Sequence, residues 1–247
     1  MCFDTEVIGN ATLYHGDALE ILPALQGGFA AVLCDPPYCS GGVTVAEKAR
    51  DTSSKYQSSE HKGLYPEFAG DARDQRSFLT WSMLWLGRAR ALAAPGALIA
   101  VFSDWRQLPT TTDALQCAGW VWRGIIPWDK TESSRPQKGR YRHQAEFVIW
   151  GTNGARPFAG PIAPGAFRMP IPRPKHHMAG KPVALMEGLL MPVEGAVLDP
   201  FMGSGTVGLA CAARGLPYVG IEFERAYFEI AKARLKQWRS DCPAETT

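Results

Sequence analysis

The fold of this chain is decided by the stretch Val197-Leu198-Asp199-Pro200-Phe201-Met202-Gly203-Ser204-Gly205-Thr206. Its apolar start predicts a buried strand, its glycines predict a turn, and an apolar helical pattern begins at Thr206. A strand, a glycine-rich turn and a helix form the repeating unit of α/β proteins. Apolar runs alternate with helical patterns along the rest of the chain as well. The sequence therefore predicts an α/β fold with a mostly parallel sheet.

The same stretch is a candidate cofactor site. Gly203, Gly205 and Gly208 match the GxGxxG pattern, and Glu222 ends the next predicted strand, where an acid commonly binds ribose hydroxyls. A cofactor that contains a nucleoside is therefore expected. Asp199 at the strand tip would repel a pyrophosphate and attract an ammonium, and the turn is longer than the one dinucleotide sites use. These details favour S-adenosylmethionine, and a nicotinamide-dependent oxidoreductase is the alternative from another class of enzyme.

A second motif, Asp35-Pro36-Pro37-Tyr38, follows the apolar run 29–33. Proline fixes φ at about −65° and has no N–H, so nearby carbonyls stay available as hydrogen-bond acceptors. The motif thus puts a carboxylate, a rigid carbonyl and an aromatic ring at one strand tip. A planar substrate with an exocyclic NH₂ suits such a site, because the ring can stack on it and the acceptors can take its two hydrogens. A proline-rich turn with Asp35 as its cap is the purely structural alternative.

With both motifs in this order, the chain resembles the amino-methylating DNA methyltransferases, which modify adenine N6 or cytosine N4. Within them it is similar to the permuted group (beta class), whose DPPY block precedes the S-adenosylmethionine-binding block. The likeness covers nearly the whole chain, although only these two motifs are specific. It implies one domain, residues 1–247, with a Rossmann-like class I methyltransferase fold. The expected sheet has seven mostly parallel strands and an antiparallel edge formed by 120–128 and 146–150.

The resemblance also implies site residues. The catalytic set would be Asp35, Pro36, Pro37 and Tyr38, with Asp35 and the Pro36 carbonyl accepting the amine hydrogens and Tyr38 stacking on the base. Glu222 would bind the ribose, Asp17 the cofactor's adenine amino group, and Lys181 would lie near its carboxylate. The family usually has a polar residue two positions before this lysine, where this chain has Ala179. The cofactor set as a whole is Asp17, Asp35, Lys181, Asp199, Pro200, Phe201, Gly203, Ser204, Gly205, Thr206, Glu222 and Phe223.

The resemblance further implies direct methyl transfer to a base that has left the duplex. In this family Asp as the first residue of the motif favours adenine N6, and Ser favours cytosine N4. We therefore expect N6-adenine methylation, with N4-cytosine methylation or an RNA substrate as alternatives. No Pro-Cys dipeptide is present, so the cysteine-nucleophile route of C5-cytosine enzymes is not expected.

Charge is unevenly distributed along the chain. The formal net charge is +2, yet residues 123–176 hold ten Lys or Arg against three Asp or Glu, which leaves that segment at +7 and the remainder at −5. A basic segment in an otherwise acidic chain suggests a polyanion as partner. Segments 39–76 and 131–176, the second rich in Pro and Gly, are the candidates for DNA contact and base recognition. The candidate phosphate contacts are Arg135, Lys138, Arg140 and Arg142.

The remaining features concern compartment and partners. The six cysteines are scattered without CxxC or metal-like spacing, which predicts reduced thiols in a cytoplasmic protein and no metal site. The resemblance implies double-stranded DNA, a homodimer and a cognate restriction endonuclease as partners, as in restriction–modification systems. A DNA-binding protein with a degenerate enzyme fold is a further alternative. The intact Asp35, Tyr38, Asp199 and Glu222 argue against it.

Overall fold

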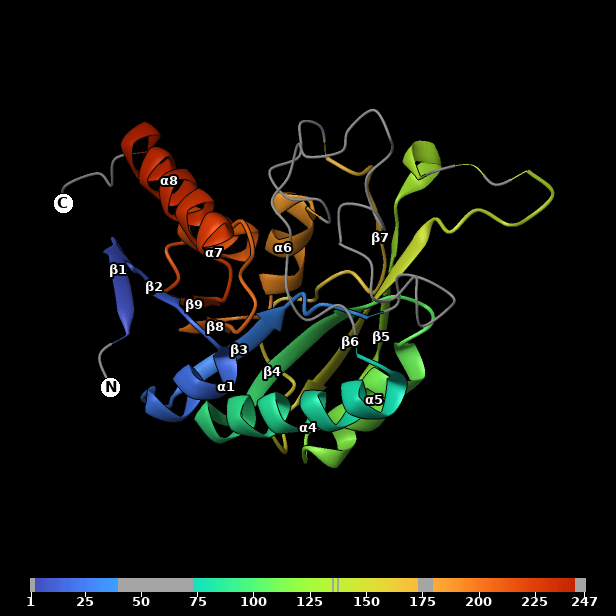
Figure 1. The fold of residues 1–247 in the computed structure, drawn as a ribbon, viewed down its shortest axis with the longest axis horizontal. Coiled ribbons are helices and arrows are strands. Elements are labelled where there is room, and N and C mark those ends of the chain that lie inside the picture. The colour runs from blue at the N-terminus through green and yellow to red at the C-terminus, as the bar shows by residue number, and fades with distance from the viewer. Residues whose placement is uncertain (1–2, 40–72, 135, 137, 173–179, 243–247) are drawn as a thin grey trace.

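The computed structural model describes residues 3–39, 73–134, 136, 138–172 and 180–242. In this part of the chain nine strands form one sheet in the order β1-β2-β9-β8-β3-β4-β6-β5-β7 (Figure 1). The strands are β1 (Asp4–Ile8), β2 (Ala11–His15), β3 (Phe29–Cys34), β4 (Ala93–Ser103), β5 (Val121–Asp129), β6 (Ala145–Thr152), β7 (Phe167–Arg168), β8 (Val197–Asp199) and β9 (Tyr218–Glu222). The helices are α1 (Ala18–Ile21), α4 (Gln75–Leu92), α5 (Leu108–Cys117), α6 (Val183–Leu190), α7 (Thr206–Ala213) and α8 (Arg225–Asp241), with short 3-10 turns η1 (Leu22–Ala24) and η3 (Thr131–Ser133).

The centre of the sheet is parallel, as the sequence predicts. Strands β2, β9, β8, β3 and β4 run in the same direction. The expected antiparallel pair also forms, between β5 and β6, but β6 lies inside the sheet because it pairs with β4 on its other side. Nine strands replace the expected seven, since β1 and the two-residue β7 extend the two edges. The first of these is largely exposed, so its sequence lacks the apolar signal of a buried strand.

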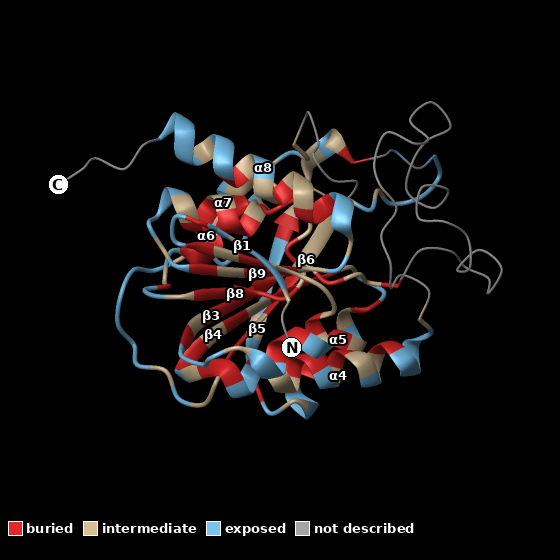
Figure 2. Ribbon diagram, turned by 60° about the vertical axis from the view of Figure 1, so that its left-hand side comes forward, coloured by how far each residue is buried: buried red, intermediate tan, exposed pale blue. Residues whose placement is uncertain are grey.

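Helices cover both faces of the sheet (Figures 1 and 2). One face packs on α1, α4 and α5, and the other packs on α6, α7 and α8, so that two separate cores form. The buried residues of α4 recur at helical spacing, which explains why its sequence pattern predicts a helix: they are Phe78, Ser82, Trp85, Leu86, Ala89 and Leu92. The resulting three-layer arrangement is that of doubly wound α/β domains.

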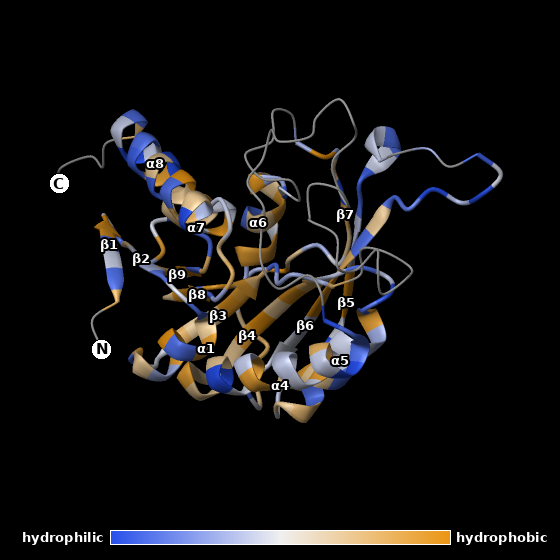
Figure 3. Cartoon of the chain, viewed as in Figure 1, coloured by the Kyte–Doolittle hydropathy of each residue, from blue (hydrophilic) through white to orange (hydrophobic). Residues whose placement is uncertain are grey.

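The carboxyl ends of the parallel strands meet at one edge of the sheet. Val32 of β3 pairs with Leu198 of β8, and Asp199 pairs with Gly220 of β9, so the loops that follow these strands lie side by side. Ligands of open α/β sheets bind at this edge. At the same edge, the segment between β5 and β6 projects away from the sheet, and Figure 3 shows it as mainly hydrophilic. None of the helices in the described ranges is long and apolar enough to cross a membrane.

Candidate active site

A cavity of about 530 Å³ opens at the carboxyl ends of the strands. Its lining contains every predicted catalytic and cofactor residue except Gly205. Gly205 instead precedes α7 as its N-cap with φ of +80°, and a Cβ there would lie 3.0 Å from the Cβ of Ala231 in α8. This glycine therefore permits a left-handed turn and close helix packing behind the cavity. The two motifs, far apart in the sequence, thus face a single cavity.

Glu222 is held by the turn that follows β8 and by the residues that follow β9. Its carboxylate accepts hydrogen bonds from the backbone N–H groups of Gly203 and Glu224, both at 2.8 Å. Burial raises the pKa of Glu222 to about 7, although these N–H groups favour the ionised form. The carboxylate is therefore fixed in orientation at the end of β9 and titrates near neutrality.

Asp199 lies at the end of β8, with a residue exposure of only 1%. Its carboxylate accepts hydrogen bonds from the N–H of Phe201 at 3.2 Å and the hydroxyl of Tyr218 at 3.1 Å. Burial raises the pKa of Asp199 well above its ordinary value. Across the described residues, Asp199 forms no ion pair with a lysine or arginine. A ligand that carries an ammonium would supply the missing positive charge.

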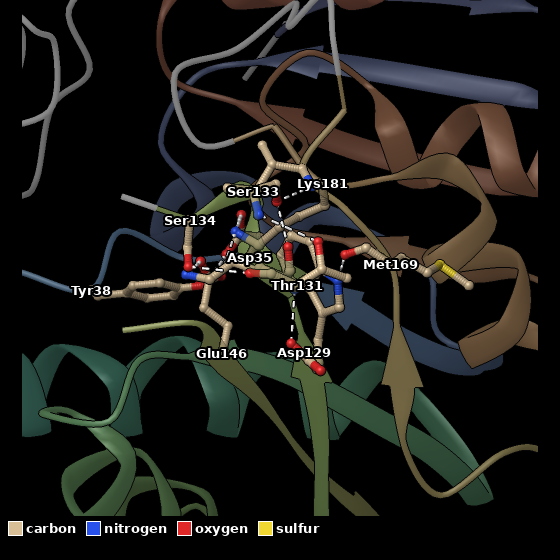
Figure 4. A network of polar contacts seen from close by, with 12 residues as sticks. Asp35, Tyr38, Asp129, Thr131, Ser133, Ser134, Glu146, Met169 and Lys181 are labelled. Carbon is tan, nitrogen blue, oxygen red and sulfur yellow. Dashed lines mark hydrogen bonds and ion pairs between the residues drawn. The ribbon is translucent and has the colours of Figure 1, made fainter. Parts of the chain in front are cut away.

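Asp35 lies next to Asp199 across the sheet, at the end of β3. The hydroxyl of Tyr38 donates to its Oδ1 at 2.5 Å, and Nζ of Lys181 lies 2.6 Å from its Oδ2 (Figure 4). Burial raises the pKa of Asp35, and Lys181 acts in the opposite direction. The side chain of Lys181 is 4% exposed. The sequence analysis places this lysine beside the cofactor; in the structure its ammonium lies on the DPPY carboxylate.

Glu146 completes this group. Its Oε2 lies 3.2 Å from Nζ of Lys181 and its Oε1 lies 3.0 Å from Nζ of Lys130. Burial disfavours the charge on Glu146, but the two lysines outweigh it and lower its pKa. The pKa of Lys181 is raised, because Asp35 and Glu146 outweigh the effect of burial. We call Asp35, Glu146, Lys130 and Lys181 the charged quartet.

Several predicted residues have local structural contacts as well. Asp17 caps α1 by accepting a hydrogen bond from the N–H of Leu19 at 2.7 Å. Phe201 packs against the rings of Trp81 and Trp85, with centroid distances of 5.3 and 5.0 Å. These contacts hold the mouth of the cavity at the ends of β2 and β8 in a defined shape.

The basic segment is only partly covered by the structure. Lys138 and Arg140 are exposed. Arg142 differs, because its guanidinium donates to the carbonyls of Glu132 at 2.6 Å and Ser134 at 2.7 Å and so orders the start of the segment. Arg135 and most of the predicted DNA-contacting segment 39–76 lie outside the described residues.

The sequence analysis missed Glu146 as a site residue. It is the second residue of β6 and is paired with Trp128 of β5. Because β6 runs antiparallel to β4, its amino end lies where the parallel strands have their carboxyl ends. An acid at the start of a strand therefore reaches this site only when that strand pairs antiparallel with the central sheet, and this pairing is known from the structure. Trp81 of α4 and Trp105 after β4 also line the cavity without having been predicted there.

This fold, with acidic side chains at the ends of β3, β8 and β9 around one cavity, defines a class I methyltransferase. Comparison with protein families matches residues 29–162 and 161–233 to a DNA methylase family, N6_N4_Mtase. The chain belongs to this family of S-adenosylmethionine-dependent DNA methyltransferases, which modify adenine N6 or cytosine N4.

Individual relatives agree with this membership. M2.LlaDCHI, a Type II methyltransferase of Lactococcus lactis subsp. cremoris, is 24% identical over 253 residues, which cover 92% of this chain and 90% of the relative. The crystal structure of the M1.HpyAVI–SAM complex superposes with a TM-score of 0.64 at 26% identity, covering 91% of this chain and 98% of that one. PvuII DNA methyltransferase, described as cytosine-N4-specific, has a TM-score of 0.68 at 15% identity over 97% of this chain and 95% of its own. The last likeness concerns the fold alone.

Proposed function

We propose that this DNA methyltransferase moves a methyl group from S-adenosylmethionine to N6 of an adenine extruded from double-stranded DNA. The observation that carries the proposal is the single cavity shared by Asp35 and Tyr38 on one side and Asp199 and Glu222 on the other. Aspartate as the first residue of the DPPY motif supports adenine over the cytosine-N4 alternative. S-adenosylmethionine would supply an electrophilic methyl group bound to a positively charged sulfur; as the N–CH₃ bond forms, the S–CH₃ bond breaks, the thioether leaves, and one amine proton is released to solvent.

Asp35 and the Pro36 carbonyl would hold the target amine. An aromatic amine is a poor nucleophile, because its lone pair is delocalised into the ring. Two fixed acceptors that receive hydrogen bonds from its two N–H groups favour a pyramidal nitrogen and keep that nitrogen in line with the methyl group. An ionised carboxylate offers about four lone-pair sites, so Asp35 can accept the amine while Tyr38 and Lys181 remain bound to it. We propose that the Tyr38 ring stacks on the base.

The cofactor would be held at the ends of β2, β8 and β9. Asp199 would bind the ammonium of its amino-acid part, Glu222 its ribose hydroxyls and Asp17 its adenine amino group. The buried carboxyl group of Asp199, without a cationic partner in the described chain, fits such a ligand. The surrounding surface would come from the turn and its neighbours: Pro200, Phe201, Gly203, Ser204, Thr206 and Phe223.

Affinity for S-adenosylmethionine is expected to rise between pH 6 and pH 8. The pKa of Glu222 in the free protein is about 7, and its ionised form is the better acceptor for two ribose hydroxyls. If only that form binds, the Kd falls about tenfold over this range. Because burial raises this pKa above the ordinary value of 4.5, the same group makes the fold less stable as the pH rises from about 4.5 towards 7, and cofactor binding offsets that loss.

Titration calorimetry in buffers of different ionisation enthalpy measures both quantities. We expect net proton release on binding at pH 6.5 by the wild type, and a Kd for Glu222→Gln that no longer varies with pH through this group. A wild-type Kd that stays constant from pH 6 to pH 8 would contradict the assignment of Glu222 to the ribose.

The exposed cations of the basic segment are expected to contact phosphates. Lys138→Ala and Arg140→Ala should each lower the slope of log Kd against log salt concentration by about 1, since each phosphate contact releases counterions. The measurement is fluorescence anisotropy with duplex DNA at several salt concentrations. Arg239→Ala provides a matched control, because Arg239 is exposed on α8, away from the projecting segment. A slope that changes equally in all three variants would count against this segment as the DNA contact.

The substrate is tested by transfer of labelled methyl groups to unmethylated genomic DNA, followed by nucleoside mass spectrometry. N6-methyladenine as the product supports the proposal, and sequencing of the modified sites gives the recognition sequence. N4-methylcytosine as the product would support the same transfer mechanism with cytosine, and not adenine, as the target base. A protein that binds S-adenosylmethionine but modifies no nucleoside in DNA would overturn the proposal and direct the search to RNA. The homodimer and the cognate restriction endonuclease stay predictions from the resemblance.

A further inference from the structure

Two oppositely charged groups lie side by side at the catalytic end of the cavity. Oδ2 of Asp35, a hydrogen-bond acceptor, lies 2.6 Å from Nζ of Lys181, a donor. Both residues line the cavity. A lysine ammonium donates hydrogen bonds and accepts none, whereas an ionised carboxylate only accepts them. The wall of the cavity therefore presents an acceptor next to a donor.

This order matches the edge of the bases that carry an exocyclic amine. Adenine offers its N6 amine as donor next to the acceptor N1, and cytosine offers its N4 amine next to the acceptor N3. Guanine and thymine present the reverse order, a carbonyl acceptor beside a ring N–H donor. An extruded base is commonly identified by hydrogen bonds to this edge. The pair Asp35–Lys181 would accept adenine or cytosine. It would reject guanine and thymine, because their carbonyl would face the Asp35 carboxylate and their ring N–H would face the Lys181 ammonium.

We propose that Lys181 is a specificity-determining residue that donates a hydrogen bond to the ring nitrogen beside the target amine, N1 in adenine. This inference rests on the proposed function. It gives the lysine a role toward the base, in place of the role toward the cofactor carboxylate implied by the resemblance. The contacts favour the base, because the ammonium lies on the carboxylate that would bind the target amine.

Glu146 acts in this scheme as a positioning residue. It holds Lys181 at 3.2 Å through Oε2, while Lys130 binds its other oxygen, Oε1, at 3.0 Å. Glu146 lies in β6 and Lys130 directly follows β5, where its N–H donates to the carbonyl of Gln144 at 2.8 Å, whereas Lys181 lies in the loop before α6. The strand pair therefore supplies a fixed point for a lysine that the loop alone would hold less well.

The decisive probe is duplex DNA with 1-deazaadenine at the target position, in the recognition sequence found for the wild type. This analogue keeps the amine and replaces N1 by C–H. We expect the wild type to show a kcat/KM about 10- to 100-fold lower for 1-deazaadenine than for adenine, the range for a lost hydrogen bond to a charged group. Equal values for the two bases would overturn the proposal without any variant.

Variants test whether Lys181 causes the preference for adenine over 1-deazaadenine. In Lys181→Met the preference for adenine over 1-deazaadenine should fall to about 1, whatever happens to the overall rate. Lys130→Met is the matched control, because it removes the other lysine on Glu146 and leaves the Asp35–Lys181 pair in place; its preference should stay well above that of Lys181→Met. Should Lys181→Met not turn over, the same preference is measured as relative affinity for the two duplexes by anisotropy. A preference that persists in Lys181→Met would overturn the proposal.

The positioning role is tested by a double-mutant cycle. Glu146→Gln should reduce the preference severalfold in the wild-type background and leave it unchanged in the Lys181→Met background. A merely structural effect of Glu146 would alter the thermal stability and the rate with both bases and would not move their ratio.

The affinity for S-adenosylmethionine distinguishes a role of Lys181 toward the base from a role toward the cofactor carboxylate. We expect the Kd of S-adenosylmethionine in Lys181→Met to stay within about threefold of the wild type. A Kd more than tenfold higher, together with an unchanged base preference, would indicate that Lys181 binds the cofactor carboxylate and not the base. A wild type that methylates no adenine would instead refute the proposed function, so the two failures are distinguishable.

Discussion

Replacing Asp35 by Ala is expected to lower kcat for methyl transfer by about 10³-fold, with little change in the Kd of S-adenosylmethionine. The carboxylate is an acceptor that Tyr38 and Lys181 hold at the tip of β3. Removing a fixed group of this kind from an active site typically costs 10²- to 10³-fold in kcat, about 3–4 kcal/mol. The alanine also leaves Lys181 with one carboxylate partner fewer, which adds to the loss.

Asp35→Asn is the control for this variant. Asparagine keeps one acceptor oxygen and the shape of the side chain, so kcat should lie between the wild type and the alanine variant. Single-turnover kinetics with cofactor-saturated enzyme isolates the chemical step from product release. A kcat for Asp35→Ala within tenfold of the wild type would remove Asp35 from the reaction.

Replacing Asp199 by Asn is expected to raise the Kd of S-adenosylmethionine by at least about 30-fold. Loss of one partner from a buried charge pair costs 2–5 kcal/mol in binding, and each 1.4 kcal/mol corresponds to a factor of ten. The free energy of unfolding, by contrast, should increase. Because burial raises the pKa of Asp199 far above its unfolded value, the charged side chain destabilises the fold at neutral pH, and the neutral amide removes that cost.

Calorimetry of cofactor binding and thermal unfolding of the free protein check the two halves of this expectation. Tyr218→Phe is the matched control, since it removes the hydroxyl that donates to Asp199 but keeps the carboxylate; its Kd should rise less than tenfold. If Asp199→Asn bound the cofactor within threefold of the wild type, the ammonium of the ligand would have to bind elsewhere.

The part of this site that can be predicted from sequence is the part that parallel strands create. Asp35, Asp199 and Glu222 each follow a short apolar run, and such strand tips meet at one edge by the geometry of the α/β fold. The cavity that joins them follows from local patterns alone. The comparisons confirm the family and the fold class that these patterns predicted.

The part that could not be predicted depends on contacts between distant residues. Nothing near Lys181 in the sequence indicates that its ammonium meets Asp35, 146 residues earlier. Glu146 reaches the site because β6 inserts between β4 and β5, a matter of strand order that periodicity does not encode. The edge strand β1 was missed for a simpler reason, since an exposed strand carries no apolar signature.

The charged quartet has a consequence for how these side chains can vary. Two carboxylates and two ammonium groups give a formal sum of zero, so the cluster is electrically compensated when all four are ionised. Removing any one leaves a partly buried, uncompensated charge, whose cost is larger than that of exchanging an opposite pair together. The stability of the fold should therefore tolerate replacement of Asp35 with Lys181, or of Glu146 with Lys130, as couples better than singly. Across homologous enzymes Glu146 and Lys130, which have no direct contact with the base in this scheme, are expected to change in concert, with the sum of their charges preserved.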